Sequence, residues 1–192
     1  MSRRHSTKDA IGSGSRRKNA SLPSSSSARP ARGSTITFPR EWSEFIALLC
    51  AHRVRFLVVG AHALAACGRP RATQDIDLLV EPSEENARRL GAALAEFGYR
   101  ALARQWRRFT ELDRMATLGR EPLRIDVLTS ISGVAFAEAW KGRRRLQHGP
   151  HRIAFLGERE FIRNKQAAGR AKDLLDLELL AEVRPHTRKP PR

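Results

Sequence analysis

Apolar residues recur at helical spacing shortly after the first 40 residues of the chain. They take the positions i, i+3, i+4 and i+7 and are Trp42, Phe45, Ile46 and Leu49. This spacing puts all four on one face, which predicts a helix packed against a core. A second helical pattern follows Ser83, a residue well suited to capping a helix N-terminus.

β-prone runs alternate with these helical patterns. The clear runs are 55–59, 76–80 and 124–128, and 109–118 is a weaker candidate for a further strand. Two closing helices are expected around 158–168 and 170–183. Alternation of strands and helices predicts an α/β or α+β domain.

Composition sets the limits of that domain. The chain has 192 residues, enough for one ordinary domain, which we expect to span residues 39–183. Residues 1–38 are rich in Ser and Arg, and we expect them and residues 184–192 to be disordered basic tails. Nine of the 36 basic residues and one of the 20 acidic ones lie in residues 1–40, so the net charge of +16 comes largely from the ends.

Other compositional features bear on location. No apolar run approaches the ~20 residues that a membrane helix needs, so no membrane partner is expected. The chain has two cysteines, which cannot form a disulfide framework. Both features predict a cytoplasmic protein.

Candidate chemistry centres on Asp75-Ile76-Asp77. On a strand, residues i and i+2 point to the same face, roughly 6–7 Å apart. Two carboxylates that close repel each other unless a cation lies between them, and magnesium prefers such ligands together with phosphate oxygens. The alternative is a pair of solvated aspartates at a strand end.

Two further features extend this hypothesis. Gly60-Ala61 follows a β-prone run and opens a short helix, where glycine lets the backbone approach a phosphate, although a tight connection explains it equally well. Asp126 lies within the apolar run 124–128, where a carboxylate is costly unless paired, metal-bound or exposed. If this strand lies beside the first, three carboxylates meet, an arrangement that suits two metal ions.

Four segments together resemble a known family. They are Val58-Val59-Gly60-Ala61, Asp75-Ile76-Asp77, Arg124-Ile125-Asp126 and the closing segment 162–177. In this order they resemble the nucleotidyltransferase superfamily with its polymerase-β-like palm, and most nearly the small bacterial nucleotidyltransferases of the AbiEii toxin group. The resemblance implies a mixed sheet flanked by helices, with a helical closure at the C-terminal end.

The resemblance also implies a reaction and a set of roles. A nucleoside monophosphate would pass from a nucleoside triphosphate to an acceptor, with pyrophosphate leaving. Asp75, Asp77 and Asp126 would be the catalytic residues and hold magnesium, or manganese in its place. Gly60 and Ala61 would contact the triphosphate. Positive charge from the closing helices would come from Lys165, with Arg170 or Lys172.

Two positions near the turn carry alternatives. Many active members have Gly-Ser or Gly-Gly where this chain has Gly60-Ala61, so a phosphate contact would fall to Thr73 or His62. Arg71 either approaches a bound phosphate or forms an ion pair with Asp75 or Glu81. His62 itself is interpreted as a core or cleft histidine.

The closing segment adds two structural expectations. Lys165 and Lys172 are seven residues apart, which on a continuous helix places them on one face. Arg170 and Asp173 have the spacing of an intrahelical ion pair.

The leading hypothesis is a magnesium-dependent nucleotidyltransferase that acts on an RNA (tRNA) or protein hydroxyl. The alternative is a catalytically weak nucleotide-binding or RNA-binding module of a toxin–antitoxin-like pair, with an antitoxin-like partner. A third possibility is a metal-dependent phosphodiesterase that uses the same carboxylates.

Overall fold

The structure, a computed structural model, describes residues 35–182 of the chain. The helices in chain order are α1 (Arg40–Ala51), α2 (Gly60–Ala66), α3 (Glu84–Glu96), α4 (Arg100–Ala103), the 3-10 helix η1 (Trp106–Thr110), α5 (Phe136–Gly142), α6 (Glu158–Ala168) and α7 (Ala171–Ala181). The strands are β1 (Phe56–Val58), β2 (Asp75–Val80), β3 (Met115–Leu118), β4 (Arg124–Leu128), β5 (Arg144–His148) and β6 (His151–Phe155).

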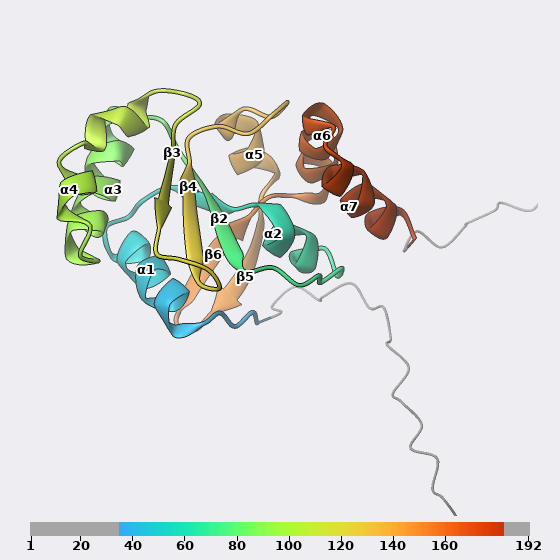
Figure 1. The fold of residues 1–192 in the computed structure, drawn as a ribbon, viewed down its shortest axis with the longest axis horizontal. Helices are drawn as coiled ribbons and strands as arrows, with labels where there is room; N and C mark the ends of the chain where they lie inside the picture. Colours follow the sequence, from blue (N-terminus) through green and yellow to red (C-terminus); the bar gives the residue numbers. More distant parts are fainter. Residues whose placement is uncertain (1–34, 183–192) are drawn as a thin grey trace, which may run out of the picture.

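The six strands form one mixed sheet in the order β3-β4-β2-β1-β6-β5. The pairs β2–β4 and β1–β6 are parallel, and the other pairs are antiparallel. Figure 1 shows α1, α3 and α4 on one side of the sheet and α2, α6 and α7 on the other. The expected α+β class with a mixed sheet flanked by helices is confirmed.

Side chains of β2 alternate between two hydrophobic clusters. Ile76 and Leu78 belong to the cluster that α1 and α3 cover, whereas Leu79 belongs to a cluster built with α2, α5 and α6. By the two-residue period of a strand, Asp75 and Asp77 share the face of Leu79. The carboxylates therefore lie on the side of the sheet that faces the C-terminal helices.

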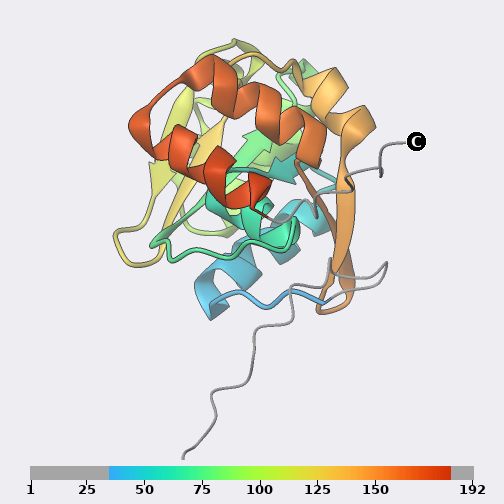
Figure 2. The same ribbon diagram turned by 90° about the vertical axis from the view of Figure 1, so that its right-hand side faces the viewer.

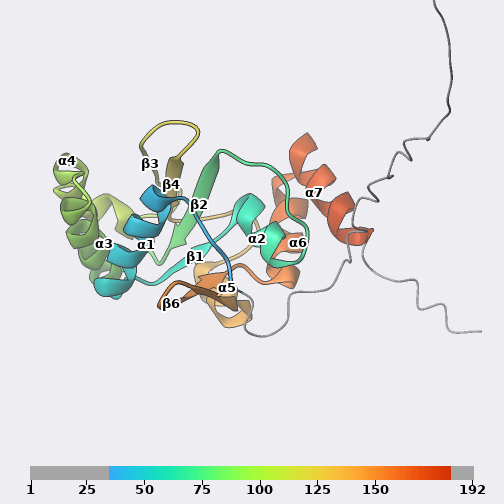
Figure 3. The ribbon, with the colours of Figure 1, turned by 90° about the horizontal axis from the view of Figure 1, so that it is seen from below.

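The C-terminal helices lie over that face. Figure 2 shows α6 and α7 packed against each other across the front of the molecule, and Figure 3 shows α2 between the strands and α6. A break at Gly169, whose φ of +62° favours glycine, separates α6 from α7.

The structure confirms some of the predicted helices and strands and differs from others. All four apolar residues predicted for the first helix are buried on α1, and the Ser83 hydroxyl caps α3 by accepting from Asn86 N–H at 3.4 Å. Within 109–118, strand structure is limited to Met115–Leu118, because Phe109 is drawn into the core on η1. The hairpin of β5 and β6 was not predicted.

The ends of the chain are described only in part. Most of the predicted tails, 1–38 and 184–192, lies outside residues 35–182. Of the four residues that do fall inside, Thr35 and Thr37 are exposed, whereas Ile36 N–H donates to Gln147 O at 2.8 Å and Phe38 is buried. Among the helices of the described range, none is both long and apolar enough to cross a membrane.

Candidate functional site

The register of β2 and β4 brings the predicted carboxylates together. The strands run parallel with Asp77 opposite Asp126 and Asp75 opposite Arg124. Residues opposite each other in paired strands share a face, so all three aspartates point to the side covered by α6 and α7. The strand adjacency on which a three-carboxylate site depends is therefore present.

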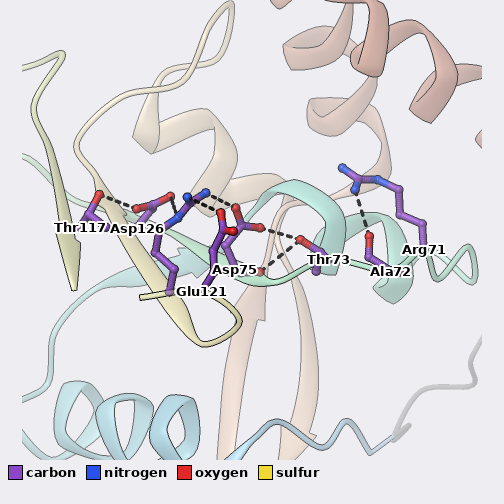
Figure 4. Close-up of polar contacts among 8 residues, drawn as sticks. Arg71, Ala72, Thr73, Asp75, Thr117, Glu121 and Asp126 are labelled. Carbon is purple, nitrogen blue, oxygen red and sulfur yellow. Dashed lines mark hydrogen bonds and ion pairs between the residues drawn. The ribbon is translucent and has the colours of Figure 1, made fainter. Parts of the chain in front are cut away.

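Threonine hydroxyls donate hydrogen bonds to the Oδ1 atoms of two of these carboxylates. Thr73 Oγ1 donates to Asp75 Oδ1 at 2.5 Å, and Thr117 Oγ1 donates to Asp126 Oδ1 at 2.7 Å. Figure 4 shows both threonines directed at their aspartates from opposite sides. Each carboxylate is thus oriented through its Oδ1 by a neighbouring hydroxyl, and its Oδ2 is left for another partner.

Arg124 fills the space between those inner oxygens. Its Nη2 lies 2.5 Å from Asp75 Oδ2, and its Nε lies 3.2 Å from Asp126 Oδ2. A third contact joins Nη1 to Glu121 Oε1 at 3.0 Å. The charge of Asp126, with the contacts of Asp75, raises the pKa of Arg124. The guanidinium is therefore the countercharge of the cluster in this structure.

Asp77 has no such partner. Within residues 35–182, no hydrogen bond or ion pair joins its carboxylate to another side chain. Burial raises the pKa of Asp77, and the charges of Asp75 and Asp126 raise it further. Burial also opposes ionisation of Asp75, but hydrogen bonds from Thr73 and Arg124 outweigh that effect and lower its pKa. The charges of Lys172 and Lys165 oppose the rise at Asp77 without cancelling it, so Asp77 is the site carboxylate whose ionisation is least favoured.

The turn at Gly60 is built against this carboxylate. Gly60 has a φ of +62°, and a Cβ added to it would lie 2.1 Å from Asp77 Oδ2. Only glycine leaves room there for the carboxylate and the backbone together. Ala61 follows as the second residue of α2 and is buried.

The donor set fits a hard divalent cation. It consists of carboxylate oxygens, which magnesium and manganese prefer, and among the described residues the Asp77 carboxylate makes no ion pair. In the described part of the chain, no three His, Cys, Asp or Glu side chains are already arranged as a metal-binding group. Arg124 instead contacts both Asp75 and Asp126.

A polar cavity of about 640 Å³ opens over these residues. All the residues predicted from the sequence line it, namely Gly60, Ala61, Arg71, Thr73, Asp75, Asp77, Asp126 and Lys165. Arg124, Arg170 and Lys172 line it as well. Acidic groups on the sheet therefore face basic groups from the closing helices across one cavity.

Lys165 is held more firmly than the sequence suggested. It is 4% exposed, and its Nζ lies 2.7 Å from both Asp173 Oδ1 and Asp176 Oδ2 on α7. Burial opposes ionisation of Asp173, but hydrogen bonds from Arg170 and Lys165 lower its pKa to about 2. Part of the charge of Lys165 is thus neutralised by protein before any phosphate arrives.

Arg71 takes part in the same network. Its Nε donates to Asp176 Oδ1 at 2.7 Å, so its ion-pair partner is neither Asp75 nor Glu81. This contact ties the segment before β2 to α7. The predicted pair of Arg170 and Asp173 is present, with Nε to Oδ2 at 2.7 Å.

Lys165 and Lys172 do not share one helix face, contrary to the expectation. The break at Gly169 places them on α6 and α7. Both still line the cavity. Lys172 makes no ion pair within the described residues. Its charge lowers the pKa of both Asp75 and Asp77, so it lies near these carboxylates without contacting either of them.

His62 lies behind the turn, as a cleft or core histidine would. Its ring meets Phe38 and Trp42 edge-on, each with centroids 5.2 Å apart. Burial lowers the pKa of His62, although a hydrogen bond with the Asp75 backbone opposes this. His62 is not among the residues that line the cavity.

The sequence analysis assigned no part in the site to Arg124 or Asp176, and it gave Asp173 only an ion pair with Arg170. Arg124 is two residues before Asp126, a spacing that puts both on one strand face and could have singled it out. Asp173 and Asp176 lie three residues apart on α7 and are both buried, and buried acids require partners.

Comparison of the chain with protein-family models finds no match, and comparison with curated proteins finds no significant similarity.

Proposed function

We propose that this protein is a metal-dependent nucleotidyltransferase, which moves a nucleoside monophosphate from a nucleoside triphosphate to a hydroxyl group. The observation that carries the proposal is the meeting of three aspartates from two paired strands with a glycine turn and a basic helix layer around one polar cavity. Phosphoryl chemistry needs positioning and charge neutralisation more than covalent catalysis, and these groups offer both. The resemblance of the four segments to the nucleotidyltransferase superfamily supports the same reaction.

Asp75, Asp77 and Asp126 would hold magnesium or manganese. When bound, the cation supplies neutralisation of the triphosphate charge and polarises the reacting phosphorus. On the side of the cavity formed by the C-terminal helices, Arg170 and Lys172 offer positive charge to the phosphates. Lys165 contributes the part of its charge that Asp173 and Asp176 do not neutralise. The backbone N–H groups of Gly60 and Ala61 are available to the phosphate oxygens.

In the reaction, the acceptor oxygen forms a bond to the α-phosphorus while the bond to pyrophosphate breaks. Asp126 receives the proton of the acceptor hydroxyl, as the resemblance implies, and the hydrogen bond from Thr117 to its Oδ1 holds the carboxylate in place. The acceptor is a hydroxyl of an RNA, such as a tRNA end, or of a protein.

Label transfer tests this proposal. The protein is incubated with each of the four α-labelled triphosphates, magnesium or manganese, and total RNA or protein as acceptor. Covalent labelling of an acceptor, lost in Asp77→Asn, is the expected result. Release of labelled nucleoside monophosphate without transfer would indicate a phosphodiesterase, and no metal-dependent reaction at all would remove the enzymatic proposal.

A nucleotide-binding or RNA-binding module with little transfer activity is the second candidate. The observation that favours it is the double ion pair of the buried Lys165, which leaves less charge for a phosphate. Ala61 also lacks the hydroxyl found at this position in many active members of the superfamily. Such a module would bind triphosphate and metal with the same carboxylates but label no acceptor, and it would act with an antitoxin-like partner.

A further inference from the structure

Arg124 is the one basic side chain that joins two of the three site aspartates among the described residues. Its position follows from the strand register, because Arg124 lies opposite Asp75 and two residues before Asp126 on the same face. The Arg124 side chain is 32% exposed, and Arg124 belongs to neither hydrophobic cluster, so it can leave this position without opening the core.

The contacts of Arg124 are made to particular oxygens. Oδ1 of Asp75 and Oδ1 of Asp126 are engaged by Thr73 and Thr117. The remaining oxygen of each carboxylate, Oδ2, faces Arg124. A cation that bridges the two aspartates therefore needs the same oxygens that the guanidinium occupies.

A guanidinium and a divalent cation cannot share those oxygens. Both are positive, and close like charges repel strongly where water is partly excluded. Charge-assisted hydrogen bonds from an arginine to two carboxylates are among the stronger polar contacts in proteins. Metal binding at this place must therefore break them.

We propose that Arg124 is an internal counter-ion that competes with the divalent cation for Asp75 and Asp126, and so sets the metal concentration at which the site loads. This inference rests on the proposed function, since it takes the aspartates to be metal ligands. Arg124 is a positioning residue here, and its effect on the metal is opposite in sign to that of a ligand.

Glu121 gives the displaced side chain a place to stay. Its Oε1 already contacts Arg124 Nη1 at 3.0 Å, and its side chain is 58% exposed. With the two aspartate oxygens given up to a cation, Arg124 would still have this contact.

Manganese binding to the full-length protein tests the competition without any catalytic readout. Free Mn²⁺ is followed by electron paramagnetic resonance while wild type and Arg124→Gln are titrated with Mn²⁺ alone. Because the variant loses the competing contacts, its Mn²⁺ affinity should be about tenfold higher than that of wild type. Its Tm without metal should fall, since three carboxylates then face one another uncompensated, and Mn²⁺ should raise it by more than in wild type.

Two further variants make the result specific. Arg114→Gln removes the same charge from the neighbouring exposed pair with Glu111 and should leave Mn²⁺ affinity within twofold of wild type. Should Arg124→Gln not fold without metal, Arg124→Lys serves instead, because a single ammonium cannot bridge both carboxylates as a guanidinium does. An intermediate gain in affinity is expected for it.

The outcomes separate the two claims. Suppose that wild type binds Mn²⁺, that Asp77→Asn does not, and that Arg124→Gln binds it no more tightly than wild type. This result overturns the competition but leaves the proposed metal site standing. An equal gain in Arg114→Gln also overturns it, because net charge would then be the cause. Mn²⁺ binding by none of the proteins contradicts both the competition and the metal site of the proposed function.

Discussion

The α-carbon of Gly60 lies against the carboxylate of Asp77, so closely that a Cβ there would be 2.1 Å from Asp77 Oδ2. One residue opens the helix that follows β1, and the other lies in the middle of β2, so the contact fixes the turn relative to the carboxylates. Any side chain at position 60 must push Asp77 aside. The position of the Gly60 backbone, which would contact the phosphates, therefore depends on the position of the Asp77 carboxylate, which would hold the metal.

Gly60→Ala should damage both stability and metal binding. A matched control is Gly169→Ala, which has the same φ of +62° but whose nearest neighbour, Gln166 O, would be 3.9 Å from the new Cβ. The control carries only the cost of a left-handed alanine, about 1–2 kcal/mol. Gly60→Ala should cost more than the control in urea unfolding and should also weaken Mn²⁺ binding. Equal costs, with Mn²⁺ affinity kept, would contradict the contact.

Removal of the Asp77 charge should stabilise the metal-free protein. Burial and the neighbouring aspartates raise the folded-state pKa of Asp77, so its ionisation opposes folding as the pH rises from about 4 through that raised value. Asp77→Asn should therefore raise Tm at pH 7 by roughly 2–4 °C, the shift that about 1 kcal/mol produces at this chain length. The difference from wild type should vanish below pH ~4.

Thermal melts from pH 3 to 8 without metal check this pH dependence. With Mn²⁺ present, wild type should gain stability and Asp77→Asn should not. A variant that melts below wild type at every pH, with or without metal, would indicate that Asp77 is a structural core residue.

The ion pair of Lys165 with Asp173 should hold α6 and α7 together. Both side chains are buried, and loss of one partner from a buried pair costs about 3–5 kcal/mol. Asp173→Asn should destabilise by that amount at pH 7. Because the pKa of Asp173 is lowered to about 2, the stabilisation is complete above pH ~4 and is lost as the pH falls toward 2.

Glu138→Gln is the control for Asp173→Asn. It breaks the exposed pair of Glu138 with Arg163, where Nη2 and Oε2 are 3.3 Å apart, and should cost less than about 1 kcal/mol. Urea denaturation at pH 7 measures both. Similar small losses in the two variants would mean that the buried network contributes little to stability.

Patterns of short range were enough to predict much of the fold. The spacing of Trp42 and Phe45 fixes which face of α1 is buried, and the two-residue period puts Asp75 and Asp77 on one face of β2. These features depend on backbone geometry within one element. The same holds for the cap at Ser83.

Relations between distant segments could not be predicted in this way. Arg71 pairs with Asp176, 105 residues away, a contact that only the packing of α7 creates. Likewise, Gly169 could end a helix or continue one, and its left-handed conformation is what separates Lys165 from Lys172. Charged residues hid the period-two pattern of β5, and so the final hairpin was missed.

Asp126→Asn should separate binding from chemistry. Thr117 still orients the amide, and Asp75 and Asp77 remain, so triphosphate binding should stay within about tenfold of wild type. Transfer should fall by at least ~100-fold if Asp126 takes the acceptor proton. Fluorescent triphosphate binding and label transfer are measured on the same preparations. Asp75→Asn should lose both, and parallel losses in the two variants would contradict a separate role for Asp126.

Crystals soaked with Mn²⁺ and a non-hydrolysable triphosphate test the central claim most directly. An anomalous difference map should contain a manganese peak bounded by Asp75, Asp77 and Asp126, with the triphosphate against Gly60 and Ala61. Arg124 should have left the two aspartates for Glu121 or a phosphate. A map with no manganese at the carboxylates, and with Arg124 still bridging Asp75 and Asp126 beside a bound triphosphate, would contradict it.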